Sequence, residues 1–180
     1  RADRQPEFTQ LDLEMSFVTE KDIMQLIAAM FIALMGRFSE KKLASVPFAR
    51  LTYAEAMDCY GSDRPDLRFG LELKNVSEAL ANTEFKAFAG VLAAGGQVKG
   101  IVVPGGASYS RREIDDLTEF AKRSGAKGLA WIALSPDGTR SPIAKFLSES
   151  ELDAMTAGIG AETGDLCLFV DDEPAVVAKP

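Results

Sequence analysis

A row of polar side chains stands near the start of the chain. Gln10, Asp12 and Glu14 alternate with Leu11 and Leu13, and alternation with a period of two is typical of a β-strand with one polar face. Two carboxylates and an amide in one row can hold a small zwitterionic ligand and its basic neighbours, or they can face water. The alternation alone favours the solvated face, and both interpretations stay open at this point.

The residues before this row could bind phosphate and a nucleobase. Arg1, Arg4 and Gln5 lie in a charged loop, and guanidinium groups bind phosphate through paired hydrogen bonds. Phe8 offers an aromatic face on which a base can stack. The loop and the row therefore make chemical sense together.

Two other stretches are weaker candidates. The glycine-rich residues 104–108 precede an expected helix and could cradle an anion. They lack the lysine of a P-loop and the third glycine of a dinucleotide fingerprint, so a strand-to-helix turn is favoured. The acidic residues 171–173 could bind a cation, but they lack the spacing of a calcium loop and read as a solvated turn.

Composition excludes several classes of function. The chain contains no histidine, which argues against Ser-His catalysis and zinc hydrolysis. Its net charge of −7 gives no overall attraction for nucleic acid. The apolar run 27–35 is too short to span a bilayer. Cys59 and Cys167 are far apart and predict inert thiols in a reducing compartment.

The elements that must position the polar row are a strand and two helices. Thr19 and Asp22 predict a helix start, with the helix running to about Phe38. A second helix is predicted from Tyr53 to Tyr60, and a strand over 67–73.

Beyond Asn75 the pattern changes to that of a small separate module. We predict an α+β fold with two layers and a mostly antiparallel sheet. Its predicted strands are 85–93, 97–103, 127–134, 143–147 and 165–170, and its predicted helices are 111–123 and one that begins after Ser148.

At residues 1–17 the sequence closely resembles the second half of motif 2 of bacterial-type aspartyl-tRNA synthetases, which are class II enzymes. Residues 47–70 resemble the segment that follows in that family, and residues 75–170 resemble its GAD insertion domain. The resemblance implies a class II catalytic-domain fragment over 1–74, a GAD domain over 75–172, and a return to the catalytic domain over 173–180. The chain does not open on methionine, and we expect a fragment of a longer enzyme.

The resemblance also implies roles for matching residues. Gln5 corresponds to a residue of the ATP site and Phe8 to the aromatic that stacks on adenine. Gln10 and Asp12 correspond to the pocket for aspartate and its adenylate, and Glu14 belongs to the same polar network.

The loop residues Arg1, Asp3 and Arg4 correspond to the part of motif 2 that approaches the tRNA acceptor end. For the intact enzyme the resemblance implies L-aspartate, ATP with Mg²⁺, and tRNA(Asp), a homodimer, and a cytoplasmic location with no membrane partner. It assigns no catalytic side chain and no metal ligand to this chain, because such enzymes work by positioning and charge stabilisation.

Motif 1, motif 3, the anticodon-binding domain and the first half of motif 2 are missing from these residues. We therefore expect the isolated chain to be inactive and to bind no cofactor by itself. The alternative is a non-catalytic tRNA-handling module with a GAD domain, as in the B subunit of the tRNA-dependent amidotransferase. An unrelated α+β protein with an acidic surface is the third interpretation. The sequence does not distinguish tRNA(Asp) from tRNA(Asn) as the parent's substrate.

Overall fold

Helix α1 is the main element of the first fifty residues. The computed structural model describes residues 7–179, and its contacts divide the chain into two units, Arg1–Arg50 and Leu51–Pro180. This division does not test the predicted domain boundary after residue 74, which stays a prediction. Helix α1 spans Glu20–Phe38, and the Asp22 carboxylate accepts hydrogen bonds from the Thr19 N–H and hydroxyl. This predicted helix is therefore confirmed together with its start.

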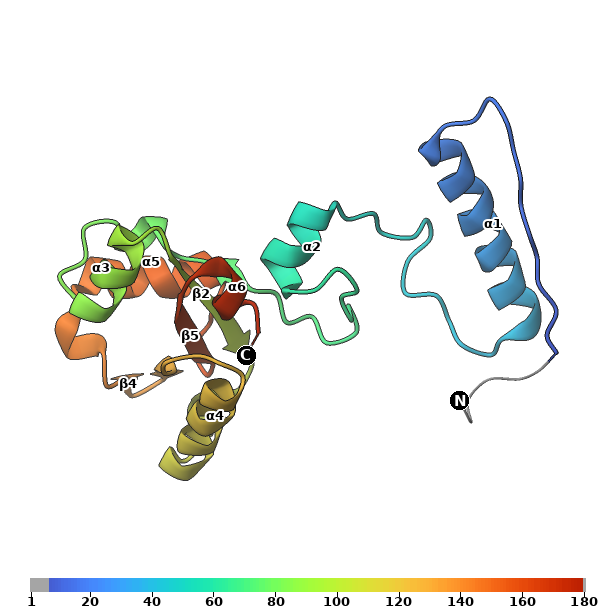
Figure 1. Ribbon diagram of the computed structural model, residues 1–180. Helices are drawn as coiled ribbons and strands as arrows, with labels where there is room; N and C mark the ends of the chain where they lie inside the picture. Colours follow the sequence, from blue (N-terminus) through green and yellow to red (C-terminus); the bar gives the residue numbers. More distant parts are fainter. Residues whose placement is uncertain (1–6, 180) are drawn as a thin grey trace. The chain divides into compact units, whose positions relative to one another are not determined.

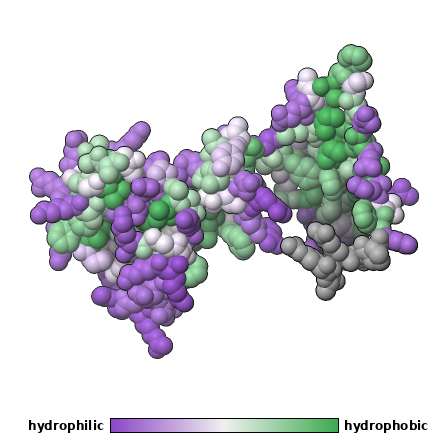
Figure 2. Space-filling model, in the orientation of Figure 1, coloured by the Kyte–Doolittle hydropathy of each residue, from purple (hydrophilic) through white to green (hydrophobic). Residues whose placement is uncertain are grey.

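The predicted strand before α1 is absent. Residues 7–15 have no regular secondary structure and are exposed. A strand needs a hydrogen-bonded neighbour, and none of the strands in the described residues pairs with this segment. Helix α1 likewise contains no buried residue, and Figure 2 shows hydrophobic side chains on its surface. Residues 7–50 of the first unit thus include many apolar side chains but form no core of their own.

The second unit is built on a sheet of five strands. All of its pairings are antiparallel, which confirms the predicted sheet type. The strands, in spatial order, are β1 (Lys74–Asn75), β2 (Gln97–Val103), β5 (Leu166–Asp172), β3 (Ala130–Ser135) and β4 (Gly138–Arg140).

Local signals set the helix boundaries in this unit. In three capping boxes a Thr or Ser at the N-cap exchanges hydrogen bonds with a Glu three residues later, at Thr52, Ser110 and Ser148. The α-helices are α2 (Tyr53–Tyr60), α3 (Lys86–Ala93), α4 (Arg111–Arg123), α5 (Glu149–Ile159) and α6 (Pro174–Val177). The 3₁₀ turns are η1 (Glu78–Leu80), η2 (Gly106–Ser108) and η3 (Ala144–Phe146).

Both faces of the sheet are covered by helices (Figure 1). On one face Phe169 packs with Phe88 of α3 and Met155 of α5. On the other face Leu168 packs with Ile114 of α4. The α+β class is confirmed, and helices lie on a second face beyond the expected two layers.

Three predicted strands of the second unit are also wrong. Within the predicted strand 85–93, Lys86–Ala93 form α3 after the N-cap Phe85. Phe85, Phe88 and Leu92 follow the helical repeat, and a short apolar run does not distinguish a helix from a strand. Residues 143–147 contain η3 instead, and β4 is the edge strand. Residues 67–73 are irregular, and the Leu73 N–H bonds to a carbonyl of α2 rather than to a strand.

Candidate functional site

The opening segment carries the described part of the predicted ligand site. Phe8 is 73% exposed, and Gln10, Asp12 and Glu14 are exposed as well. Within residues 7–179 these side chains make no hydrogen bond and no ion pair. The polar row is therefore open to solvent and is not assembled into a pocket by the described residues.

Four of the predicted site residues lie outside the described residues. They are Arg1, Asp3, Arg4 and Gln5. The expected contacts of these four side chains with phosphate and with the tRNA acceptor end therefore stay predictions.

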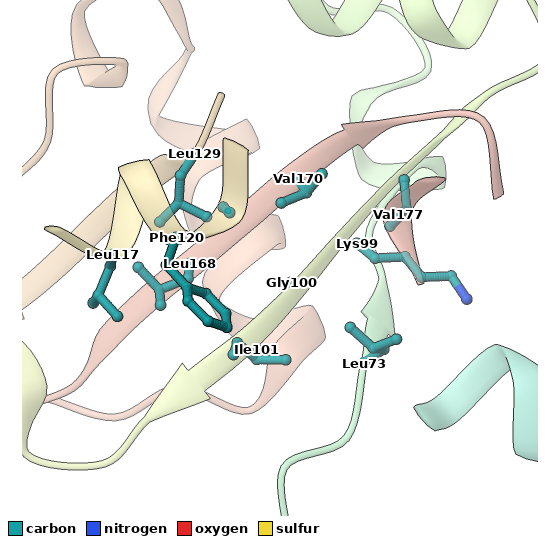
Figure 3. Close-up of a pocket in the computed structure, with 11 residues that line it drawn as sticks. Leu73, Lys99, Gly100, Ile101, Leu117, Phe120, Leu129, Leu168, Val170 and Val177 are labelled. Atoms are coloured by element: carbon teal, nitrogen blue, oxygen red, sulfur yellow. The ribbon is translucent and has the colours of Figure 1, made fainter. Parts of the chain in front are cut away.

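The second unit has an apolar groove between α4 and the sheet. It has a volume of about 170 Å³, and Figure 3 shows Phe120 and Leu117 of α4 facing Ile101 and Leu168 of the sheet. Such a surface can bury apolar groups but offers no side chain for acid–base chemistry. The one charged side chain in its lining is Lys99, whose ammonium points away from Phe120 (Figure 3).

Lys99 is a residue whose partner could not be foreseen from the sequence. Its side chain is 6% exposed, and its ammonium forms an ion pair with Asp58 of α2. The sequence signal was a lysine between Val98 and Gly100 in an apolar strand. A lysine in such a strand indicates either a solvated edge or a buried partner, and the partner here lies far away in the chain.

The glycine-rich residues 104–108 form the strand-to-helix turn that the sequence favoured. Gly105 adopts φ 71° and donates its N–H to the Asp165 carboxylate at 2.9 Å. The Ala107 N–H donates to the Gly164 carbonyl at 2.9 Å. A Cβ at Gly106 would lie 2.9 Å from the Leu166 Cβ. These glycines serve tight packing, and the Gly105 and Ala107 amides are occupied by protein acceptors.

The acidic residues 171–173 do not form the predicted solvated turn, because Asp171 and Asp172 end strand β5 and Asp172 is buried. The Asp172 carboxylate pairs with Lys127 at 3.0 Å and accepts the Glu173 N–H at 2.9 Å. These contacts, the Glu173 N–H first, lower the pKa of Asp172. Burial raises the pKa of the neighbouring Asp171. A carboxylate paired in this way and one that resists ionisation make a poor cation site.

A search for other kinds of site in residues 7–179 finds little. This part of the chain contains no group of three or more His, Cys, Asp or Glu side chains that could hold a metal ion. None of its helices is long and apolar enough to cross a membrane. Burial raises the pKa of the Cys167 thiol to about 12, so this thiol is inert as predicted.

Comparisons with known proteins agree with the sequence interpretation. The model of the family described as GAD domain matches residues 88–180. An aspartate–tRNA(Asp/Asn) ligase of Natranaerobius thermophilus is 56% identical over 178 residues, which are 99% of this chain and 30% of that protein.

Further relatives give the same picture. The aspartate–tRNA(Asp/Asn) ligase of Moorella thermoacetica is 52% identical over 99% of this chain and 30% of its own length. The aspartate–tRNA ligase of Geobacillus kaustophilus is 52% identical over the same shares. The chain spans about 30% of the length of these curated relatives.

Proposed function

The chain belongs to the GAD domain family, and from that premise we propose that it is part of an aspartate–tRNA ligase. Such an enzyme activates L-aspartate with ATP to aspartyl-adenylate and transfers the aspartate to tRNA(Asp).

One observation carries this proposal. The similarity to aspartate–tRNA ligases runs over 99% of the chain and therefore through the opening segment as well as the GAD domain. A stand-alone GAD module of the amidotransferase type needs no polar row at Gln10, Asp12 and Glu14. The amidotransferase alternative is therefore not favoured.

Within this proposal, the opening segment supplies one wall of the substrate site. Phe8 stacks on adenine, and Gln10 and Asp12 bind the aspartate or its adenylate, with Glu14 in the same network. The exposure of all four side chains supports the view that the other walls come from further parts of the parent protein. Gln5 adds an ATP contact, and Arg1, Asp3 and Arg4 contact the tRNA acceptor end.

The reaction that we propose needs Mg²⁺, but the described residues do not fit a metal site by themselves. Asp12 and Glu14 are exposed, and residues 7–179 contain no group of three or more His, Cys, Asp or Glu side chains that could hold a metal ion. Mg²⁺ is usually held by one or two carboxylates together with substrate phosphates and water. Because no hydrogen bond or ion pair within residues 7–179 fixes Asp12 or Glu14, we assign the metal to other parts of the parent and derive no step from it here. The residues of this chain act by holding ATP and aspartate in place.

Two wider statements belong to the same proposal. The parent acts as a homodimer in the cytoplasm, and the 180 residues alone are inactive. The inactivity of the isolated chain is supported by the first unit, whose apolar residues Leu11, Phe17 and Phe31 are half or more exposed. Side chains of this kind in a stable enzyme are buried by further structure.

The test is aspartate-dependent exchange between ATP and pyrophosphate. In the intact parent, Asp12→Asn should lower kcat/KM for aspartate by about 100-fold, because a charged group at the substrate is lost. Glu7→Gln is the matched control, since Glu7 is also exposed but lies outside the row. Exchange that stays at the wild-type level in Asp12→Asn would overturn the assignment of Asp12. Robust exchange by the 180 residues alone would overturn the proposed inactivity of the isolated chain.

A further inference from the structure

The C-terminal turn of α2 is held on the second unit mainly by polar contacts. The only buried residue of α2 is Ala56. A helix of eight residues is not stable alone in water. The side of α2 that faces α6 borders a hollow of about 500 Å³, lined by Met57 and Ala175 among others. Apolar packing therefore holds α2 weakly, and other contacts must keep it in place.

A charged contact comes from β2. The Lys99 ammonium is buried, and both of its hydrogen bonds go to Asp58, one to the carboxylate and one to the main-chain carbonyl at 2.7 Å. A buried ammonium is costly unless it is paired. Carbonyls in the last turn of a helix have no partner within the helix and lie at its negative end. The contacts with Asp58 thus pair the buried charge of Lys99 and also give a hydrogen-bond donor to a main-chain carbonyl in the last turn of α2.

Neighbouring groups complete the junction. The Cys59 carbonyl accepts the Leu73 N–H at 2.8 Å, just before β1. The Tyr60 hydroxyl donates to Glu72 at 2.9 Å. Gly61 ends the helix with φ 64°, and a Cβ there would lie 2.2 Å from the Ala178 carbonyl oxygen. The end of α2 is therefore fixed by β2, by the approach to β1 and by the end of α6.

We propose that Lys99 is a latch that keeps α2 docked on the GAD sheet, so that breaking its pair with Asp58 releases α2 while the sheet stays folded. Helix α2, which lies outside the residues matched by the family model, is then a detachable part of the second unit. This inference goes beyond the proposed enzymatic function, since it concerns only contacts within the second unit.

Hydrogen exchange of the 180-residue chain tests the latch. In Lys99→Met, the amides of Ala56, Gly61 and Leu73 should exchange about 10- to 100-fold faster, because a hydrogen bond to a charged group is lost. Amides in the β2–β5 ladder, such as that of Phe169, should keep their rates. The matched control is Lys127→Met, which removes an exposed lysine paired with Asp172 and should leave α2 unchanged.

Further variants keep the test decisive. Asp58→Asn retains the side-chain shape and the main-chain acceptor, and should give the same pattern even if Lys99→Met folds poorly. In the double variant, α2 should exchange no faster than in Lys99→Met alone, because both changes remove one interaction. Equal acceleration in α2 and in the ladder, additive effects in the double variant, or unchanged α2 amides would each overturn the proposal.

Discussion

Residues 10–17 and strand β2 show what alternation does and does not determine. The opening segment alternates strictly between polar and apolar residues, yet it is exposed and irregular. Strand β2 contains mostly apolar residues and one lysine, yet it pairs with β1 on one side and β5 on the other. Pattern marks which face of a segment can be buried, whereas pairing decides whether the segment is a strand.

The two helices α1 and α4 extend this contrast. Helix α1 has 19 residues and buries none of them, whereas α4 has 13 and buries Ile114 and Ala121. The outer side of α4 is strongly hydrophilic, as Figure 2 shows. Only a helix with a partner surface in the described chain can contribute a core.

The largest expected effect on stability distinguishes the loss of a buried phenylalanine from the loss of an exposed one. Phe169 is fully buried and Phe17 is 107% exposed. Phe169→Ala should lower the free energy of unfolding of the second unit by about 3–5 kcal/mol, whereas Phe17→Ala should change it by less than about 0.5 kcal/mol. Urea unfolding followed by fluorescence reports this unit alone, since Trp131 of β3 is the single tryptophan. Similar losses of unfolding free energy in both variants would contradict this prediction.

A smaller effect is expected for two glycines. A Cβ at Gly100 of β2 would lie 2.5 Å from the Phe169 ring, whereas one at Gly36 of α1 would meet nothing within 4 Å. Gly100→Ala should destabilise the second unit by about 1–3 kcal/mol. Gly36→Ala should favour α1 by about 0.5–1 kcal/mol, because alanine loses less backbone freedom. Trp131 fluorescence checks the first change, and far-UV circular dichroism the second.

The smallest expected effect concerns pH and is confined to the second unit. Burial raises the pKa of Asp171 above its ordinary value of 3.8. Ionising Asp171 in the folded state is therefore unfavourable: this penalty is absent below pH 3.8 and grows as pH rises through the raised pKa. Asp171→Asn should thus be more stable than the wild type at pH 7 and nearly equal to it at pH 3. Unfolding in urea at these two pH values gives the comparison, and equal differences at both would contradict it.

Local signals explain why most helices could be predicted. Each of the capping boxes that begin at Thr52, Ser110 and Ser148 spans only four residues. Gly61 and Gly160 both adopt the left-handed conformation that ends a helix. Such contacts depend on neighbouring residues, so the sequence contains them directly.

What could not be predicted depends on distant residues. The partner of Lys99 lies 41 residues away, and no local pattern points to it. The apolar run within Lys86–Ala93 is compatible with a helix and with a buried strand. Only its packing against the sheet decides that it is a helix. The roles of Phe8, Gln10 and Asp12 came from a family resemblance, because the described residues do not gather them into a site.

The two thiols make separate openings of the second unit measurable in one sample. Cys167 is completely inaccessible within β5, whereas Cys59 lies partly buried in the last turn of α2. An alkylating reagent should reach Cys59 whenever α2 detaches, and Cys167 only when the strands separate. Because Cys59 is only partly buried while α2 is docked, the ratio of the two labelling rates would set an upper bound on the frequency of the local event relative to complete unfolding, without any substitution in the chain.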